Sequence, residues 1–247
     1  MNRPAPLWQA TVAMTGMELR LTARRLENVL VTVVIPAVVL VFFASFGLVS
    51  TPGPRVDFLL PGAIALAILA TGLVNLGIAT AYERSYGVLK RLGGSPLPRI
   101  GLVIAKLLAV LVVEVGQIAL LLAIAIALLG WRPADLSLPL FALAVVLGTV
   151  AFVGLGLALA GTVRAETVLA LANLLFIGLL AISGIVVPTD QLPAWLASVS
   201  SLLPSSALAA LLRICAGGAG DATGPLAVLA AWSIAAPLVA AATFHWE

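Results

Sequence analysis

The sequence has little charge. Only 9% of its 247 residues are Asp, Glu, Lys or Arg, whereas 62% are hydrophobic and the mean hydropathy is +1.21. A soluble domain usually carries about 25% charged residues, so this chain lacks the polar surface that a water-soluble globule needs. The composition therefore predicts a polytopic membrane protein with almost no domain outside the bilayer.

Chemically reactive side chains are also scarce. The single cysteine, Cys215, excludes an intrachain disulfide, so it is either a small buried hydrophobe or a bridge to a second subunit. The single histidine, His245, stands at the C-terminus, and we expect neither a metal site nor catalytic residues. Neither of the two lysines, Lys90 and Lys106, follows a glycine, so the Gly-Lys pair of a phosphate-binding loop is missing. We therefore expect that the chain is not an enzyme and does not hydrolyse ATP itself.

Long apolar runs recur along the chain. A helix needs about 20 apolar residues to cross roughly 30 Å of hydrocarbon, and six segments meet this length. The expected spans cover residues 29–49, 59–81, 100–129, 138–161, 167–187 and 225–244. Because no internal repeat or linker divides them, we expect one all-α membrane domain over residues 1–247.

Two further segments look helical but do not span. Residues 1–28 mix apolar and basic positions in a way that is typical of an amphipathic interface helix lying along the membrane surface. Residues 188–213 contain Pro188, Pro193 and Pro204, so no uninterrupted run crosses the bilayer there. Two short half-helices in a re-entrant or surface hairpin on the outer side fit this second segment better.

The basic residues indicate how the chain is oriented. The net charge of +3 is spread over connectors and ends, which argues against a nucleic-acid partner. With the N-terminus in the cytoplasm, the inside segments hold Arg3, Arg20, Arg24, Arg25, Arg84, Lys90, Arg91, Arg99, Lys106 and Arg164, and the outside segments hold Arg55, Arg132 and Arg213. This bias predicts a multi-pass protein of the plasma (inner) membrane with both termini in the cytoplasm. Trp131 and Trp195 should then be outer interfacial anchors, and Lys106 should extend to the headgroups.

The stretch AYERSYGVLKRLGGSPLPR, residues 81–99, gathers five of the 23 charged residues between two spans. We expect a short cytoplasmic helix over residues 82–92, in which Glu83, Gly87 and Lys90 share one face. Gly87 would leave a notch in that face where the backbone of another protein could approach. Orientation of the chain alone is the simpler explanation of these charges, and both readings stay open.

This stretch resembles the cytoplasmic signature of type-2 ABC exporter permeases, E-R/K-x-x-G-T-L-K/E-x-L-x-x-[ST]-P-L. The matching residues are Glu83, Arg84, Gly87, Leu89, Lys90, Leu92, Ser95, Pro96 and Leu97. Val88 departs from the pattern, because threonine is commoner there. The segment SGIVVPTDQLPAWLASVSSLLPSSALAALLR is similar to the proline-broken outer hairpin of the same family, although the acidic residue often found before its Leu-Arg pair is absent. With the helix before the first span, the resemblance covers nearly the whole chain.

The resemblance implies a membrane subunit of a bacterial ABC exporter, a class that moves drugs, lipids and polysaccharides outward by alternating access. The loop would be a coupling helix docked on a separate ATPase, which would bind ATP and Mg. The ATPase-coupling residues would be Glu83, Arg84, Gly87, Leu89, Lys90, Arg91 and Pro96. Six spans are half of the family's usual twelve, which implies a second permease copy, as in a homodimer, or a relative.

The nature of the cargo is only weakly indicated. The aromatic content of 6% speaks against a sugar-stacking channel, so we expect a hydrophobic drug-like or lipid-like substrate, as in multidrug export. The alternative function is an ATP-independent secondary transporter or a membrane scaffold protein. Import in place of export also stays open.

Four polar residues inside the expected spans are candidates for a substrate path: Glu114, Gln117, Asn75 and Asn173. Glu114 falls near mid-bilayer, and Gln117, three residues further on, shares its face. A charged group at this depth is costly unless it is paired, hydrated or protonated. A substrate-path or proton-sensitive role and a simple interhelical hydrogen bond, to Asn75, Asn173 or a backbone carbonyl, are equally compatible with the sequence.

Small residues cluster in the span expected over residues 138–161. They are Gly148, Gly154, Gly156, Ala160 and Gly161. Small side chains let helices approach closely in a membrane. They could serve packing within one subunit or a seam between two permease copies, and both readings stay open.

Overall fold

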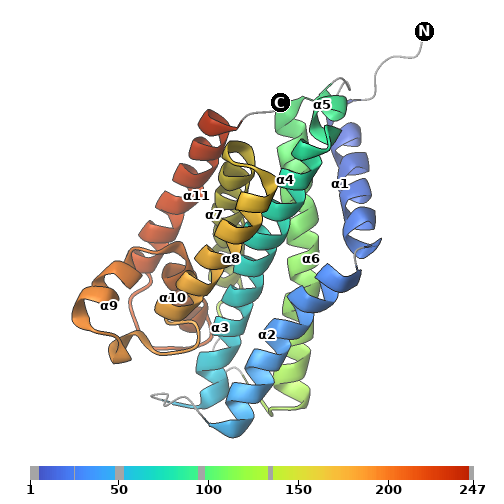
Figure 1. Cartoon of the computed structure of the whole chain (residues 1–247). Coiled ribbons are helices and arrows are strands. Elements are labelled where there is room, and N and C mark those ends of the chain that lie inside the picture. The colour runs from blue at the N-terminus through green and yellow to red at the C-terminus, as the bar shows by residue number, and fades with distance from the viewer. Residues whose placement is uncertain (1–5, 25, 48–52, 94–97, 133–135, 245–247) are drawn as a thin grey trace.

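The computed structural model describes residues 6–24, 26–47, 53–93, 98–132 and 136–244, and for residues 26–31, 92, 93 and 99 it describes the backbone alone. Every regular element in this part of the chain is a helix, which confirms the all-α fold class (Figure 1). In chain order they are α1 (Leu7–Arg24), α2 (Leu26–Phe46), α3 (Arg55–Leu69), the π-helix η1 (Ala70–Asn75), α4 (Leu76–Ser85), α5 (Val88–Gly93), α6 (Arg99–Ala127), α7 (Leu138–Thr162), α8 (Ala165–Ile182), the 3₁₀ turn η2 (Thr189–Gln191), α9 (Ala194–Ser201), α10 (Pro204–Cys215) and α11 (Thr223–Thr243).

Five helical runs are long and apolar enough to cross a membrane. They are Arg55–Ser85, in which α3, η1 and α4 form one run, and the long helices α6, α7, α8 and α11. The described apolar part of α2, Thr32–Phe46, is shorter, and α9 with α10 would count as a sixth span although they meet at 81°. The chain is therefore a multi-pass membrane protein. The start of α1, α5 and the end of α11 lie at one end of the bundle (Figure 1).

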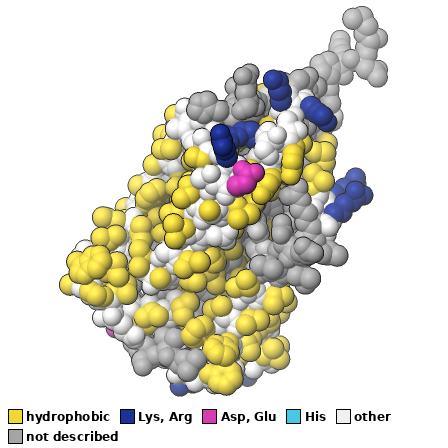
Figure 2. All heavy atoms as spheres, viewed as in Figure 1, with side chains coloured by type: hydrophobic (Ala, Val, Ile, Leu, Met, Phe, Trp, Pro, Cys, Tyr) yellow, Lys and Arg dark blue, Asp and Glu magenta, His cyan; other side chains and the backbone are white. Residues whose placement is uncertain are grey.

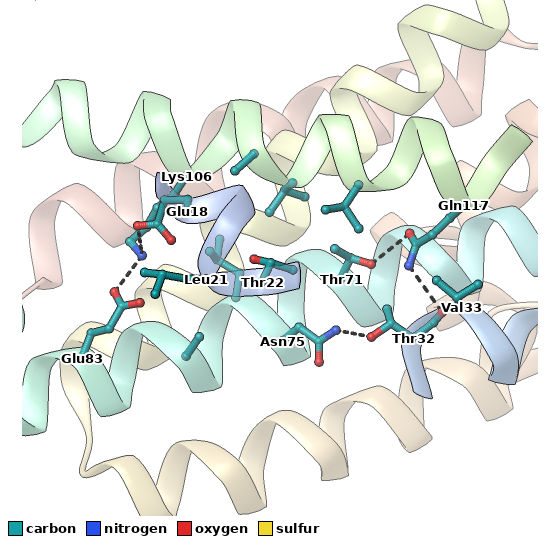
Figure 3. Close-up of a pocket in the computed structure, with 15 residues that line it drawn as sticks. Glu18, Leu21, Thr22, Thr32, Val33, Thr71, Asn75, Glu83, Lys106 and Gln117 are labelled. Carbon is teal, nitrogen blue, oxygen red and sulfur yellow. Dashed lines mark hydrogen bonds and ion pairs between the residues drawn. The ribbon is translucent and has the colours of Figure 1, made fainter. Parts of the chain in front are cut away.

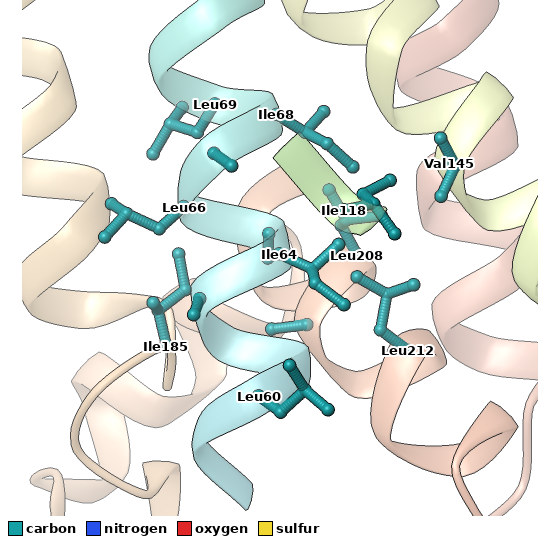
Figure 4. Close-up of a cluster of buried hydrophobic side chains, with 14 of the residues drawn as sticks. Leu60, Ile64, Leu66, Ile68, Leu69, Ile118, Val145, Ile185, Leu208 and Leu212 are labelled. Atoms are coloured by element: carbon teal, nitrogen blue, oxygen red, sulfur yellow. The ribbon is translucent and has the colours of Figure 1, made fainter. Parts of the chain in front are cut away.

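Helix α3 is the central helix of the core. Its residues from Leu59 to Leu69 are all buried, as expected of a helix that is apolar on every side. Figure 4 shows this helix surrounded by side chains from four other parts of the chain: Ile118 (α6), Val145 (α7), Ile185 (after α8), and Leu208 and Leu212 (α10). In a membrane such a core is held by van der Waals packing, because lipid tails are as apolar as the side chains.

The glycines of α7 pack inside the subunit. A Cβ at Gly156 would lie 2.5 Å from the carbonyl oxygen of Gly72, and a Cβ at Gly154 would lie 2.6 Å from the nitrogen of Pro237. Gly148 similarly faces Leu208. The absent side chains thus let α7 touch η1, α11 and α10 closely. Of the two readings of this cluster, the structure favours packing within one chain.

Helix α1 packs lengthwise on α6. Met14 is buried in a cluster with Ala105, Thr15 Oγ1 donates to the carbonyl oxygen of Ala105 at 3.4 Å, and Glu18 is ion-paired with Lys106. These contacts advance along both helices together, so α1 and the first half of α6 run side by side in the same direction (Figure 1). The placement of this helix along a membrane surface stays a prediction.

The proline-broken hairpin consists of α9 and α10. Arg213 ties it to the rest of the bundle, because its guanidinium donates to the carbonyl oxygens of Gly184, of Ile185 (3.4 Å) and of Phe58 (3.4 Å). The same guanidinium lies 3.8 Å from the centroid of the Phe58 ring, in a cation–π contact. Cys215, at the end of α10, is fully buried, which favours the reading of a small buried hydrophobe.

Trp131 differs from its predicted role as an interfacial anchor. Its side chain is buried, and its Nε1 donates to Oδ1 of Asp57 at 2.8 Å. Because a buried indole N–H needs a hydrogen-bond partner, this bond ties the link after α6 to the start of α3. The anchor prediction for Trp131 is therefore wrong. Trp195, on α9, is 69% exposed, and its place at the membrane boundary stays a prediction.

Candidate functional site

The connector between α4 and α6 begins as two helices rather than one. α4 ends at Ser85 and α5 begins at Val88. Gly87 separates them with φ +70°, a left-handed conformation that costs other residues about 1–2 kcal/mol, and its N–H bonds to the carbonyl oxygen of Arg84 at 3.0 Å. The prediction of one helix over residues 82–92 is wrong, because the missing side chain of Gly87 permits a turn instead of forming a notch in a helical face.

This turn leaves a compact exposed surface at one end of the bundle. Tyr86 is 72% exposed, and Val88, Lys90 and Arg91 are exposed as well. A Cβ added at Gly87 would meet no atom within 4 Å. Figure 2 shows Lys and Arg side chains gathered at the same end of the molecule. We call Tyr86, Val88, Lys90 and Arg91 the α5 surface.

Leu89 anchors α5 on its inner side. It is 1% exposed and belongs to a cluster with Met14 of α1 and with Leu102 and Ala105 of α6. A short helix of six residues has little stability of its own. This contact therefore holds α5 against the N-terminal halves of α1 and α6.

Lys106 is the centre of a buried ion cluster. Its Nζ lies 2.7 Å from Oε2 of Glu83 and 2.9 Å from Oε1 of Glu18, so it joins α4, α1 and α6 (Figure 3). Its side chain is 2% exposed. The prediction that Lys106 extends to the headgroups is wrong, because two carboxylates meet the ammonium inside the protein. Such a group is stable only while all its charges are paired, since desolvation is costly.

Arg84 makes the second link from the end of α4. Its guanidinium donates to the carbonyl oxygen of Val163, in the short connection between α7 and α8. Glu83 and Arg84 therefore point to opposite neighbours, one toward α1 and α6 and the other toward α7 and α8. Both side chains are engaged within the chain and only partly exposed.

A small polar cavity of about 80 Å³ lies beside the ion cluster. Figure 3 shows Glu18, Glu83 and Lys106 at one end of it and four uncharged polar residues at the other. There Thr71 Oγ1 donates to Oε1 of Gln117 (3.2 Å), Gln117 Nε2 donates to the carbonyl oxygen of Thr32 (3.4 Å), and Asn75 Nδ2 donates to Oγ1 of Thr32. Thr71 and Asn75 belong to η1, and π-helical turns are frequent at functional sites.

The other two candidates for a substrate path lie elsewhere. Glu114 is fully buried and faces α7, where its Oε2 accepts a hydrogen bond from Thr149, while its Oε1 has no partner among the described residues. Asn173 is exposed on α8 and donates to the carbonyl oxygen of Leu169 at 2.7 Å in its own helix. The structure thus brings Asn75 and Gln117 together and separates Glu114 and Asn173 from them.

A family model for the ABC-2 type transporter matches residues 9–215. The chain belongs to the ABC-2 type transporter family. The match runs from α1 to the end of α10, so it includes the connector and the hairpin that carry the resemblance to type-2 ABC permeases. No curated protein matches the chain.

ABC-2 family members are the membrane components of ABC transporters and are not ATPases themselves. Membership therefore implies an ABC ATPase subunit as the partner of this chain. In this ABC-2 chain the seven expected coupling residues divide into three groups: Gly87, Lys90 and Arg91 lie in or beside the α5 surface, Glu83, Arg84 and Leu89 bond or pack within the subunit, and Pro96 lies outside the described residues. The α5 surface is thus smaller than the sequence motif.

Sequence reasoning missed three residues of this ABC-2 site: Glu18, Thr32 and Thr71. Thr71 stands four residues before Asn75, and this spacing of two polar residues in an apolar span was a usable signal. Glu18 gave no such signal, because its partner Lys106 is 88 residues away in the sequence.

Proposed function

We propose that this ABC-2 chain is the permease of an ATP-binding cassette exporter that moves a hydrophobic drug-like or lipid-like substrate out of the cell. A separate ATPase would bind the α5 surface and supply the energy by hydrolysing Mg-bound ATP. The observation that carries the proposal is the α5 surface itself, which is exposed, basic and joined to the bundle through the ends of α4. In the same proposal, the chain pairs with a second permease copy as a homodimer. It lies in the plasma membrane with both termini in the cytoplasm.

The links behind the α5 surface support a mechanical role. A push on α5 reaches α4 through a two-residue turn, and α4 is bonded through Glu83 to Lys106 and Glu18 and through Arg84 to Val163. Displacement of one helix end would thus move α1, α6 and the α7–α8 connection together. Rigid-body transmission of this kind is an ordinary route for coupling nucleotide hydrolysis to a change of access.

Asn75 and Gln117 are the best candidates for a substrate path in this proposal. Both line the polar cavity between α2, η1 and α6, and a cavity of about 80 Å³ has room only for water-sized groups in the present conformation. The outward switch would have to widen it. Glu114 is better placed to hold α6 to α7 through Thr149, and Asn173 would face lipid or a second copy.

The test is charge reversal on the α5 surface. Lys90→Glu combined with Arg91→Glu should weaken binding of the co-purifying ATPase and lower substrate-stimulated ATP hydrolysis in proteoliposomes at least tenfold, while the helical circular dichroism spectrum stays unchanged. Arg132→Glu is the matched control, because Arg132 is exposed in the α6–α7 link at the other end of α6. Full ATP-coupled transport by the double variant would remove the α5 surface from the mechanism.

A further inference from the structure

A second hollow, which we call the α6–α7–α11 groove, shares the wall residue Lys106 with the polar cavity. Its volume is about 640 Å³, within the range of about 300–1,000 Å³ that is typical of small-molecule sites. It extends from Leu89 and Phe244, at the α5 end of the bundle, to Val150 and Ile234, near the middle of α7 and α11. Its lining is almost entirely apolar.

One buried hydroxyl beside the groove lacks a partner among the described residues. Thr80 of α4 lines the groove and is 1% exposed, and its Oγ1 makes no hydrogen bond with any residue that the structure describes. Buried polar groups in native proteins are nearly always satisfied, so an orphaned one points to an absent ligand or water. Thr80 is three residues before Glu83, or about 4.5 Å deeper along α4 at 1.5 Å per residue.

The rim of the groove faces hydrocarbon. Ile100, Ile234 and Leu238 line it and are each more than 60% exposed, and all three belong to helices long and apolar enough to span a membrane. An open apolar hollow in this setting is in contact with lipid tails and not with water. A flexible apolar chain is the group available to fill it.

We propose that the α6–α7–α11 groove binds one acyl chain of a phospholipid from the leaflet on the α5 side, and that the Thr80 hydroxyl donates a hydrogen bond to the ester carbonyl at the head of that chain. The chain would run from Thr80 toward Val150 and Ile234. The carbonyl lies where the hydrocarbon meets the headgroups, which suits a hydroxyl one turn below the ion cluster of Lys106. The Lys and Arg side chains at this end (Figure 2) suit an anionic headgroup.

A second copy of the chain is a less suitable occupant. A stable subunit contact needs about 800 Å² of complementary surface on each partner, whereas the groove is a local hollow whose polar lining residues are Thr80 and Lys106. An acyl chain with an ester carbonyl at its head would pack against the apolar lining and accept a hydrogen bond from Thr80. The lipid is a resident ligand in this proposal, so it stands apart from the cargo of the transporter.

The test places a large side chain in the groove by substituting a residue at its rim. Ala241 is exposed and lines the groove, whereas the neighbouring Ala242 is exposed and does not line it. The full chain is purified in mild detergent with added dioleoylphosphatidylglycerol, and bound lipid is counted by native mass spectrometry. Wild type and Ala242→Trp should each retain one more phospholipid per chain than Ala241→Trp. Equal retention by all three proteins would overturn the proposal.

A second variant tests the proposal even if Ala241→Trp misfolds. Thr80→Val removes only the hydroxyl and keeps the shape, so the gain in melting temperature on adding phosphatidylglycerol should fall to less than half of the wild-type gain, while Thr80→Ser keeps it. An unchanged gain in Thr80→Val would contradict the assigned hydrogen bond. If Ala241→Trp instead dissociates a dimer and leaves the lipid count unchanged, the groove is a subunit contact and the proposal fails.

Discussion

Glu83 Oε2 lies 2.7 Å from the ammonium of Lys106, and that ammonium also holds Glu18. Glu83 stands three residues before Tyr86, so the ion cluster lies about one helical turn from the α5 surface. One buried cation thereby connects the proposed docking surface to α1 and α6. The cluster carries two negative charges and one positive charge, which makes it sensitive to loss of the cation.

Replacement of the cation should be strongly destabilising. Lys106→Met keeps the length of the side chain but leaves two carboxylates close together and largely buried, and removal of one partner from a buried ion group costs about 3–5 kcal/mol. The measurement is the free energy of unfolding, from denaturant titration in detergent. Lys106→Met with Glu18→Gln and Glu83→Gln should recover most of the loss, because no unpaired charge remains. A single variant as stable as wild type would contradict the buried pairing.

The turn at Gly87 should not tolerate a side chain without strain. Gly87→Ala meets no steric clash, since the space around its Cβ is open, so the whole effect is the cost of the left-handed backbone, about 1–2 kcal/mol. Thermal unfolding followed by circular dichroism measures it. Gly16→Ala in α1, which also has open space but a helical backbone, should be neutral or stabilising by about 0.5–1 kcal/mol. Equal effects of the two changes would argue against the turn.

The long helices of the fold could be predicted from the sequence because each span needs only a run of about 20 apolar residues in its own segment. Hydropathy alone placed the helices that became α6, α7 and α11 to within a few residues at each end. The expected fifth span ran to residue 187, whereas α8 ends at Ile182 and the backbone turns at Gly184 (φ +69°). An apolar loop such as SGIV cannot be distinguished from the end of a span by composition.

The site was less accessible to sequence reasoning, because its geometry depends on distant partners. Lys106 was read as a snorkelling residue from its depth alone, and nothing local indicates that Glu18 and Glu83 meet it. A glycine at position 87 is compatible with a notch in one helix and with a turn between two helices. The pattern of charges favoured the notch, whereas the structure has the turn. Trp131 was assigned by residue type, whereas its bond to Asp57 is a tertiary contact.

The close contact between α7 and η1 gives a further prediction. Gly156→Ala would put a Cβ 2.5 Å from the carbonyl oxygen of Gly72, and backbone cannot give way as a flexible side chain can. Overpacking of this kind typically costs about 1–3 kcal/mol, so thermal stability in detergent should fall clearly. Gly178→Ala in α8 is the matched control, because its added Cβ meets no atom within 4 Å. If both variants unfold at the same temperature, α7 does not approach η1 as described.

The hairpin should depend on the shape of Arg213 as well as on its charge. Its planar guanidinium donates to the carbonyl oxygens of Gly184, Ile185 and Phe58 at once while lying over the Phe58 ring. Lysine has a single ammonium and cannot reproduce this fork, so Arg213→Lys should leave partly buried carbonyls unsatisfied and cost about 1–3 kcal/mol. Hydrogen exchange measured by mass spectrometry should be faster in α9 and α10 of Arg213→Lys than in the same helices of wild type, whereas exchange in α7 should be unchanged. Arg132→Lys, at an exposed position, should change neither stability nor exchange, and a hairpin as protected in Arg213→Lys as in wild type would show that charge alone is sufficient.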